Sequence, residues 1–342
     1  MKYLSDKALA RLQDGSDLPE LAGTRYRLLQ EVARGGMGVV YAAQDENLHR
    51  RVALKVLEVP GEQGELANRL VREARVLALL EHPGIVPVHD VGTLADGRVF
   101  YTMKFVEGQR LDQYVALASI PDRLRLFLRI CEAVAFAHAR GVLHRDLKPA
   151  NVMVGPFGEV LVVDWGLAKI LDKVHPLGSR DGAADATILD RAAVPRGDDR
   201  TEVSPLTGHG TVMGTPGYMS PEQARGDVAA LDARSDIFSL GALLGFLVDS
   251  KSAQGSSESV RFNRSLESIC GKATAREPAA RYQTVQDLAL DVSRYLDGLA
   301  VAAHRESVVE KTLRFYRRYR FFILLILAYL VMRMLLLIFL KR

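Results

Sequence analysis

The chain has 342 residues, of which 48% are hydrophobic and 25% charged, so it is long enough for one large or two modest domains. Its two cysteines, Cys131 and Cys270, lie far apart, which excludes a disulfide framework or a zinc pattern and indicates a reducing compartment. The net charge of +4 comes from residues 311–342, which hold eight Lys/Arg and no Asp/Glu, whereas residues 1–310 hold 37 basic and 41 acidic residues. The body of the chain is therefore predicted not to bind nucleic acid.

Residues 1–23 are polar and form a predicted N-terminal segment outside the folded domain. From residue 25 to 105 the sequence alternates or is β-branched, which predicts a strand-rich region. One helix is expected to interrupt the strands at residues 65–80, where apolar residues recur at helical spacing: Leu66, Leu70, Ala74 and Leu77. The first part of the chain is therefore predicted to be a small β-rich lobe.

From about residue 110 the pattern becomes helical. Apolar periodicity predicts helices at 123–139, 235–248 and 285–296, with short strands at 151–154 (NVMV) and 159–164 (EVLVVD). Residues 172–213 are poor in large apolar side chains, so we expect a mobile loop there. The predicted fold class is α+β, with a larger helical lobe after the β-rich one.

An apolar segment, FFILLILAYLVMRMLLLIFL, occupies residues 321–340. As a helix it is about 30 Å long, the thickness of a bilayer core. Five basic residues precede it and two follow it, which predicts a single-pass anchor in the cell (inner) membrane, with residues 1–320 in the cytoplasm. Its one charge, Arg333, is expected to snorkel toward the far side or to pair with a partner helix.

The alternatives for this segment are a buried core helix and an amphipathic surface helix. A core helix rarely stays apolar on every face for so long, and residues 321–340 offer no polar face for a surface helix. The sequence therefore favours contact with a lipid bilayer.

The stretch VARGGMGVVY, residues 32–41, is the first candidate for a functional site. Gly35, Gly36 and Gly38 let backbone N–H groups approach phosphates closely between two predicted strands. A glycine-rich hairpin turn is at least as common an explanation of the same pattern. The stretch is not a Walker loop, because no GK[ST] follows and no helix begins there.

Lys55 lies in the apolar strand RVALKVL, and Glu73 lies on the predicted helix that follows. Taken alone, each side chain is more often solvated. Together they offer an ion pair that could fix a phosphate-binding ammonium. A later strand ends in Asp164, followed by Gly166, which suits a metal-bound carboxylate on a flexible turn.

The stretch GVLHRDLKPANVMV, residues 141–154, places an acid, an amine and an amide within six positions: Asp146, Lys148 and Asn151. Apolar runs flank these residues, and Pro149 rules out a regular helix through the middle. An acid, an amine and an amide on one short, stiff loop indicate a chemical role for this stretch.

In this order, GGMGVVY, VALK, Glu73, HRDLKPAN, DWG, GTPGYMSPE and SDIFSLG resemble the motifs of eukaryotic-like serine/threonine protein kinases in their bacterial form. The resemblance covers roughly residues 24–298 and implies a two-lobed kinase fold. The implied parts are an N-lobe at about 24–104, a C-lobe at about 108–298, a mobile activation segment at 164–222, a basic juxtamembrane segment at 299–320 and the transmembrane helix at 321–340.

The resemblance implies transfer of the γ-phosphoryl group of ATP to serine and threonine hydroxyls of proteins, with Mg²⁺ or Mn²⁺ as the metal. Asp146 would accept the hydroxyl proton and Lys148 would offset charge on the phosphoryl group. Asn151 and Asp164 would hold the metal. The implied nucleotide-binding residues are Val32, Ala33, Arg34, Gly35, Gly36, Met37, Gly38, Val40, Ala53, Lys55, Glu73, Met103, Lys104, Phe105, Val106 and Met153.

Further roles follow from the same resemblance. Thr215 would lie near Asp146, Asp236 would brace the catalytic loop, and Glu222 would pair with Arg281. Autophosphorylation of the activation segment would create a partner for Arg145; its candidate hydroxyls are those of Thr201, Ser204, Thr207 and Thr211.

The sequence departs from the family pattern at four places. Ala33 replaces the first glycine of the phosphate loop, Trp165 replaces the usual phenylalanine after the metal aspartate, and Ser220 replaces an alanine. We expect the indole of Trp165 to fill the same apolar slot. Residues 249–264 are short and polar where the family has another helix, which bears on substrate docking.

Two other functions compete with an active kinase. A pseudokinase that binds nucleotide as a membrane scaffold would explain Ala33 and the short 249–264 region, but it would not need Lys55, Asp146 and Asp164 together. A small-molecule phosphotransferase would not need GTPGYMSPE, which resembles a peptide-holding segment.

Overall fold

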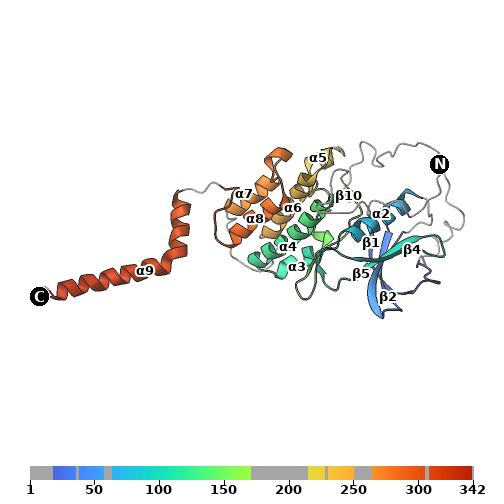
Figure 1. Cartoon of the computed structure of the whole chain (residues 1–342), viewed down its shortest axis with the longest axis horizontal. Coiled ribbons are helices and arrows are strands. Elements are labelled where there is room, and N and C mark those ends of the chain that lie inside the picture. Colours follow the sequence, from blue (N-terminus) through green and yellow to red (C-terminus); the bar gives the residue numbers. More distant parts are fainter. Residues whose placement is uncertain are drawn as a thin grey trace, which may run out of the picture.

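The structure is a computed structural model, and it describes residues 18–35, 38–57, 64–170, 215–227, 230–249, 264–304 and 308–340. The predicted segment 1–23 therefore lies mostly outside the described residues, as do all of 172–213 and most of 249–264. In the described part the strands gather at one end of the body and the helices at the other (Figure 1). The predicted two-lobed α+β fold is confirmed.

The N-terminal lobe holds a five-stranded antiparallel sheet in the order β1-β2-β3-β5-β4, with one helix against it, among the described residues. Its elements are β1 (Tyr26–Gly35), β2 (Gly38–Asp45), β3 (Arg50–Val56), α2 (Glu65–Leu79), β4 (Val88–Thr93) and β5 (Val99–Lys104). The predicted helix is thus present, and Leu70, Ala74 and Leu77 are buried. Leu66 belongs to the same helix, as predicted, but is 42% exposed, because it lies beside the buried stripe, which begins at Ala67.

The C-terminal lobe is mainly helical, with short strand pairs beside the catalytic loop. Its elements are β6 (Gln109–Arg110), α3 (Leu111–Tyr114), η1 (Val115–Leu117), α4 (Ile120–Ala139), β7 (Val142–Leu143), η2 (Pro149–Asn151), β8 (Val152–Val154), β9 (Val160–Val162), β10 (Lys169–Ile170), α5 (Pro221–Ala224), α6 (Ala233–Val248), α7 (Arg264–Ala273), η5 (Pro278–Ala280), α8 (Val285–Leu296) and α9 (Val308–Leu340). The predicted helices at 123–139, 235–248 and 285–296 correspond to α4, α6 and α8.

Side-chain caps fix where the helices of this lobe begin. Ser119 accepts from the backbone N–H of Asp122 at the start of α4, and Thr284 accepts from that of Asp287 at the start of α8. Ser220 and Gln223 form a reciprocal capping box on the short helix α5. Each cap satisfies backbone donors that a first helical turn leaves without partners.

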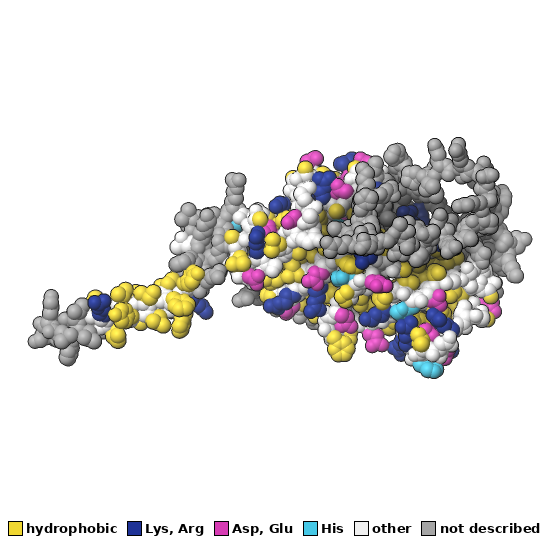
Figure 2. Space-filling view, in the orientation of Figure 1, with side chains coloured by type: hydrophobic (Ala, Val, Ile, Leu, Met, Phe, Trp, Pro, Cys, Tyr) yellow, Lys and Arg dark blue, Asp and Glu magenta, His cyan; other side chains and the backbone are white. Residues whose placement is uncertain are grey.

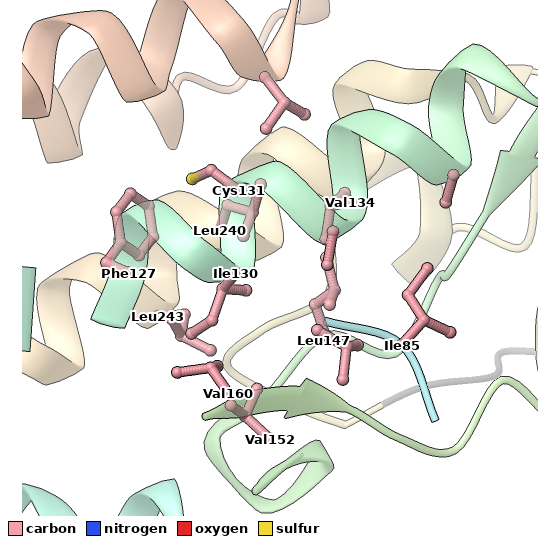
Figure 3. Packing of buried hydrophobic residues seen from close by; sticks show 14 of the residues in the cluster. Ile85, Phe127, Ile130, Cys131, Val134, Leu147, Val152, Val160, Leu240 and Leu243 are labelled. Carbon is pink, nitrogen blue, oxygen red and sulfur yellow. The ribbon is translucent and has the colours of Figure 1, made fainter. Parts of the chain in front are cut away.

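A large apolar core joins α4, α6 and the β8–β9 pair (Figure 3). Phe127, Ile130 and Val134 of α4 meet Leu240 and Leu243 of α6, and all are fully buried. Leu147 projects into the same core from the catalytic loop. Burial of one such side chain contributes about 1.5–3 kcal/mol, so the loop is fastened to the most rigid part of the lobe.

Helix α9 extends away from the two lobes (Figure 1). In the part of the chain that the structure describes, no helix has both the length and the apolar character needed to cross a bilayer. The span predicted at residues 321–340 is therefore not confirmed; its described side chains end at Met334. Those from Phe321 to Met334 form a largely apolar, exposed surface (Figure 2).

Candidate active site

The ammonium group of Lys55 is buried between β3 and α2. Lys55 is 8% exposed, and its Nζ donates to both carboxylate oxygens of Glu73, at 2.8 and 2.9 Å. Glu73 itself is 2% exposed. The ion pair predicted from the sequence is thus present, and it links the sheet to the helix.

Asp164 approaches the same ammonium from the C-terminal lobe, with its Oδ1 3.5 Å from Lys55 Nζ. Its backbone has a φ of 63°, a conformation that costs a non-glycine residue energy and is common at functional turns. Burial by itself would lower the pKa of Lys55, but the charges of Glu73 and Asp164 outweigh burial and raise the pKa above the ordinary value. Lys55 is therefore charged at physiological pH.

Asp146, Lys148 and Asn151 converge on the loop between β7 and β8. Lys148 Nζ donates to Asp146 Oδ2 at 2.7 Å, and Asn151 Nδ2 donates to the same oxygen at 3.1 Å. Thr215, from a segment far along the chain, donates to Asp146 Oδ1 at 3.0 Å and accepts from Lys148 at 2.7 Å. The expected proximity of Thr215 to Asp146 is confirmed.

The buried carboxylate of Asp236, on α6, holds the backbone of this loop. It accepts the N–H groups of His144 and Arg145 at 2.9 and 2.8 Å, and it pairs with His138 Nε2 at 2.8 Å. Burial would raise the pKa of Asp236, but the contacts with His138 and the backbone lower it below the ordinary value. The bracing role expected for Asp236 is confirmed.

Trp165 occupies the apolar slot that was predicted for it. Its side chain is 1% exposed, its indole Nε1 donates to the carbonyl oxygen of Val162 at 3.3 Å, and its ring centroid lies 4.5 Å from that of His144. Because Asp164 precedes it directly, the indole fixes one end of the turn that carries this carboxylate.

The predicted adenine-binding side chains share one face of the sheet. Strand pairing sets Val40 opposite Lys55 and Ala53 opposite Met103, and paired residues point to the same face. Ala53 is buried, whereas Val40 and Met103 are half-buried. Met153 follows from the other lobe on β8 and is also half-buried. Val40, Ala53 and Met103 thus share one face of the sheet, and Met153 lies on β8 of the other lobe; their contact with a nucleotide base stays a prediction.

Three further predicted nucleotide-binding residues follow β5, where the chain passes between the lobes: Lys104 is exposed, and Phe105 and Val106 are half-buried. The predicted phosphate loop forms the β1–β2 hairpin. Within it Val32, Ala33, Arg34 and Gly35 are exposed, whereas Gly36 and Met37 lie outside the described residues.

Gly38 opens β2 with a φ of 143°, and a Cβ there would overlap the carbonyl oxygen of Val56 on β3. Only glycine allows this close approach at the end of the hairpin.

Sequence reasoning missed Tyr101, which completes the buried cluster. Its hydroxyl donates to Glu73 Oε1 at 2.8 Å, and its ring lies beneath Lys55 Nζ. Tyr101 lies two residues before Met103, so the alternation of a strand places both on the same sheet face. That alternation was a usable signal, but an aromatic residue in a strand is normally assigned to the core.

The predicted pair of Glu222 and Arg281 is confirmed and fully buried. Arg281 donates to both carboxylate oxygens at 2.7 and 2.8 Å, and Ser235 donates to the first of them at 2.9 Å. Burial would raise the pKa of Glu222, but these hydrogen bonds lower it to about 2. The pair fastens α5, just after Thr215, to the helical lobe.

The comparison with protein families agrees with this geometry: the family described as "Protein kinase domain" matches residues 26–299. This chain belongs to the protein kinase family. The family fold has a β-sheet N-lobe and a helical C-lobe, and its members use ATP and a divalent metal, generally Mg²⁺, to act on proteins.

Curated relatives include the serine/threonine-protein kinase PknD of Protochlamydia amoebophila, 33% identical over 80% of this chain and 30% of its own length. PknD of Chlamydia trachomatis serovar L2b is 35% identical over 80% of this chain and 32% of its own length. The chain thus spans about a third of the curated relatives it matches. The crystal structure of the Mycobacterium tuberculosis PknI kinase domain is 24% identical, with a TM-score of 0.52, covering 79% of this chain and 95% of that one; it supports the fold.

The Glu222–Arg281 pair predicts that the free energy of unfolding falls at acidic pH. The carboxyl pKa is depressed in the folded state, so the stabilisation is fully present above pH 4.5 and is lost as the pH falls toward about 2. Glu222→Gln is expected to lower the free energy of unfolding at pH 7 by about 3–5 kcal/mol, because Arg281 stays buried without its counter-charge. Urea unfolding from pH 7 to pH 2.5 measures this.

The control for that experiment is Glu31→Gln, which removes an exposed ion pair with Arg34. This exposed substitution should leave the fall of the unfolding free energy at acidic pH essentially as in wild type. If Glu222→Gln and wild type lose stability in parallel between pH 4.5 and 2.5, the depressed pKa of Glu222 is wrong.

Proposed function

We propose that this chain is an active serine/threonine protein kinase that transfers the γ-phosphoryl group of Mg-ATP to protein hydroxyls. The observation that carries the proposal is that the predicted catalytic side chains form two clusters. Lys55, Glu73 and Asp164 meet within 3.5 Å contacts on one side, and Asp146, Lys148 and Thr215 meet on the other. The names of the PknD relatives support the class of reaction.

The nucleotide would bind between the lobes. Val40, Ala53, Met103 and Met153 supply apolar surface for the base, and the backbone of residues 104–106 supplies hydrogen-bonding groups at its edge. Lys55 would contact the α- and β-phosphates, because its ammonium is fixed by Glu73 and remains charged. The β1–β2 hairpin would cover the phosphates with backbone N–H groups.

Asn151 and Asp164 fit a hard divalent cation such as Mg²⁺, which prefers oxygen ligands. Both side-chain hydrogen bonds of Asn151 come from its Nδ2, so its side-chain oxygen Oδ1 can turn toward a metal. The carboxylate of Asp164 is half-exposed. A bound metal would supply charge neutralisation between phosphates, which phosphoryl transfer requires.

Asp146 would orient the substrate hydroxyl and accept its proton. Thr215 already places a hydroxyl at hydrogen-bonding distance of Asp146 and Lys148, which indicates how an acceptor hydroxyl fits there. Lys148 would balance negative charge on the transferred group. Most of the catalysis would then come from positioning and electrostatic stabilisation.

The pseudokinase alternative predicts nucleotide binding without turnover. Lys55, Glu73 and Asp164 are in contact with one another, and so are Asp146, Lys148 and Asn151; a protein without turnover would not need either cluster, which argues against the alternative.

The first test uses the full chain in detergent with labelled ATP, Mg²⁺ and a generic protein substrate. Asp146→Asn should lower the rate by about 10²–10⁴-fold, because it removes the proton acceptor and keeps the shape. Lys55→Ala should weaken nucleotide binding, whereas Asp146→Asn should not. Equal phosphate incorporation by wild type and Asp146→Asn would contradict the proposal.

We also propose that phosphorylation of the activation segment regulates the enzyme. The candidate hydroxyls of Thr201, Ser204, Thr207 and Thr211 lie outside the described residues. Support comes from Arg145: its Nε is buried and has no hydrogen-bond partner within the described part of the chain. A phosphate group would supply that partner.

This regulation predicts that wild-type protein incubated with Mg-ATP carries phosphate within residues 172–215, measured by phosphopeptide mass spectrometry. Arg145→Gln should keep the modification but lose the accompanying rise in activity. Active protein that shows no modified residue in that range would contradict the proposal.

We further propose that residues 321–340 anchor the enzyme in the cell membrane as a single-pass helix, with the kinase domain in the cytoplasm. Support comes from the sequence and from the exposure of Leu324, Leu325, Ile326 and Leu327, which are 55–59% exposed. Four successive residues point to all sides of a helix, so no side of this turn packs against protein. Arg333 would then face the opposite interface or a partner helix.

The anchor predicts that the full chain stays with membranes after an alkaline wash, whereas a variant ending at residue 310 becomes soluble and keeps its kinase activity. A second variant, Arg333→Leu, should stay membrane-bound. If Arg333 pairs with a partner helix, this variant should also give a lower yield of cross-linked complex. Recovery of the shortened variant in the membrane pellet would contradict anchoring by this segment.

A further inference from the structure

The hydroxyl of Tyr101 makes the third hydrogen bond to the buried carboxylate of Glu73, beside the two from Lys55 Nζ. It lies 2.8 Å from Glu73 Oε1, the oxygen that also accepts from Lys55 Nζ. Tyr101 belongs to β5 and is 1% exposed, so this contact ties α2 directly to the sheet. A hydrogen bond to a charged group in such a buried place is among the stronger ones in proteins.

The contact matters because Lys55 has two tasks. It binds Glu73 and Asp164 in the structure, and in the proposed function it must also contact phosphates. As its ammonium turns toward a phosphate, its hydrogen bonds with Glu73 lengthen or are shared. The buried carboxylate then keeps a full partner only if another donor remains. Tyr101 is that donor.

We propose that Tyr101 is a positioning residue for phosphoryl transfer: it holds Glu73, and through it α2 and Lys55, while the nucleotide occupies the site. This inference rests on the kinase activity proposed above. Tyr101 touches neither substrate nor metal in this role. Its ring beneath Lys55 Nζ adds a favourable cation–π contact that limits the movement of the ammonium.

The Tyr101 hydroxyl also remains a hydrogen-bond donor over a wide pH range. Burial, followed by the neighbouring negative charge of Glu73, raises the pKa of Tyr101 well above its ordinary value. The group therefore keeps its proton across the pH range of any kinase assay, and its effect on activity should not add a titration of its own.

The test is Tyr101→Phe in the full chain, which removes the hydroxyl and keeps the ring. The KM for Mg-ATP should rise about tenfold, as expected for a lost hydrogen bond to a charged group, while the KM for the protein substrate stays within twofold. The pH dependence of kcat should keep its shape.

The matched control is Tyr26→Phe. Tyr26 is also a buried tyrosine of the same lobe, and its hydroxyl donates to Asp90 at 3.0 Å and contacts Thr102, far from Glu73. Thermal unfolding should show a similar loss of stability in both variants, but the KM for Mg-ATP should change only with Tyr101→Phe. An equal change in both would mean that the effect is general softening of the lobe and would overturn the proposal.

A double-mutant cycle separates the role further. In a Glu73→Ala background, Tyr101→Phe should change the KM for Mg-ATP by less than twofold, because its acceptor is gone. A full tenfold effect in that background would overturn the proposal. If the wild-type chain transfers no phosphate, the kinase proposal fails, and the role of Tyr101 is decided by titration with a fluorescent ATP analogue and Mg²⁺: weaker binding by Tyr101→Phe supports it, and equal binding overturns it.

Discussion

The buried ion pair between Lys55 and Glu73 is the constraint on which the rest of the site depends. A charge of either sign at that depth is costly to desolvate, so the ammonium and the carboxylate have to stay together. Because one partner belongs to β3 and the other to α2, this requirement fixes the helix against the sheet. Asp164 then brings the second lobe to the same point.

The catalytic loop, between β7 and β8, is held by the apolar core of the C-terminal lobe rather than by an ion pair. Leu147 is inserted into the apolar core between α4 and the β8–β9 pair, and its neighbours on either side face outward as Asp146 and Lys148. Asp236 accepts the backbone N–H groups just before them. Because Leu147 is held in the core of the helical lobe, the side chains of Asp146 and Lys148 on either side of it are held in one direction.

The sequence was sufficient for most of the architecture and for the principal charged residues, since motif order and periodicity are local signals. Leu66 shows where periodicity is too coarse: it recurs at helical spacing with Leu70, yet it is exposed, because the buried stripe of α2 begins one residue later, at Ala67. Tyr101 shows a second limit, because a hydrogen bond between β5 and α2 depends on register and helix placement, which no single segment encodes. The nucleotide-binding role of Gly36 and Met37 stays a prediction, because both lie outside the described residues.

Trp165 gives the protein an optical property of its own. It is the chain's single tryptophan, and it is packed against His144 immediately after the carboxylate of Asp164. Its intrinsic emission therefore originates from one place, the turn between the two lobes. A spectral shift to the red would report water reaching that turn, so exposure of this indole can be followed in solution without any attached dye.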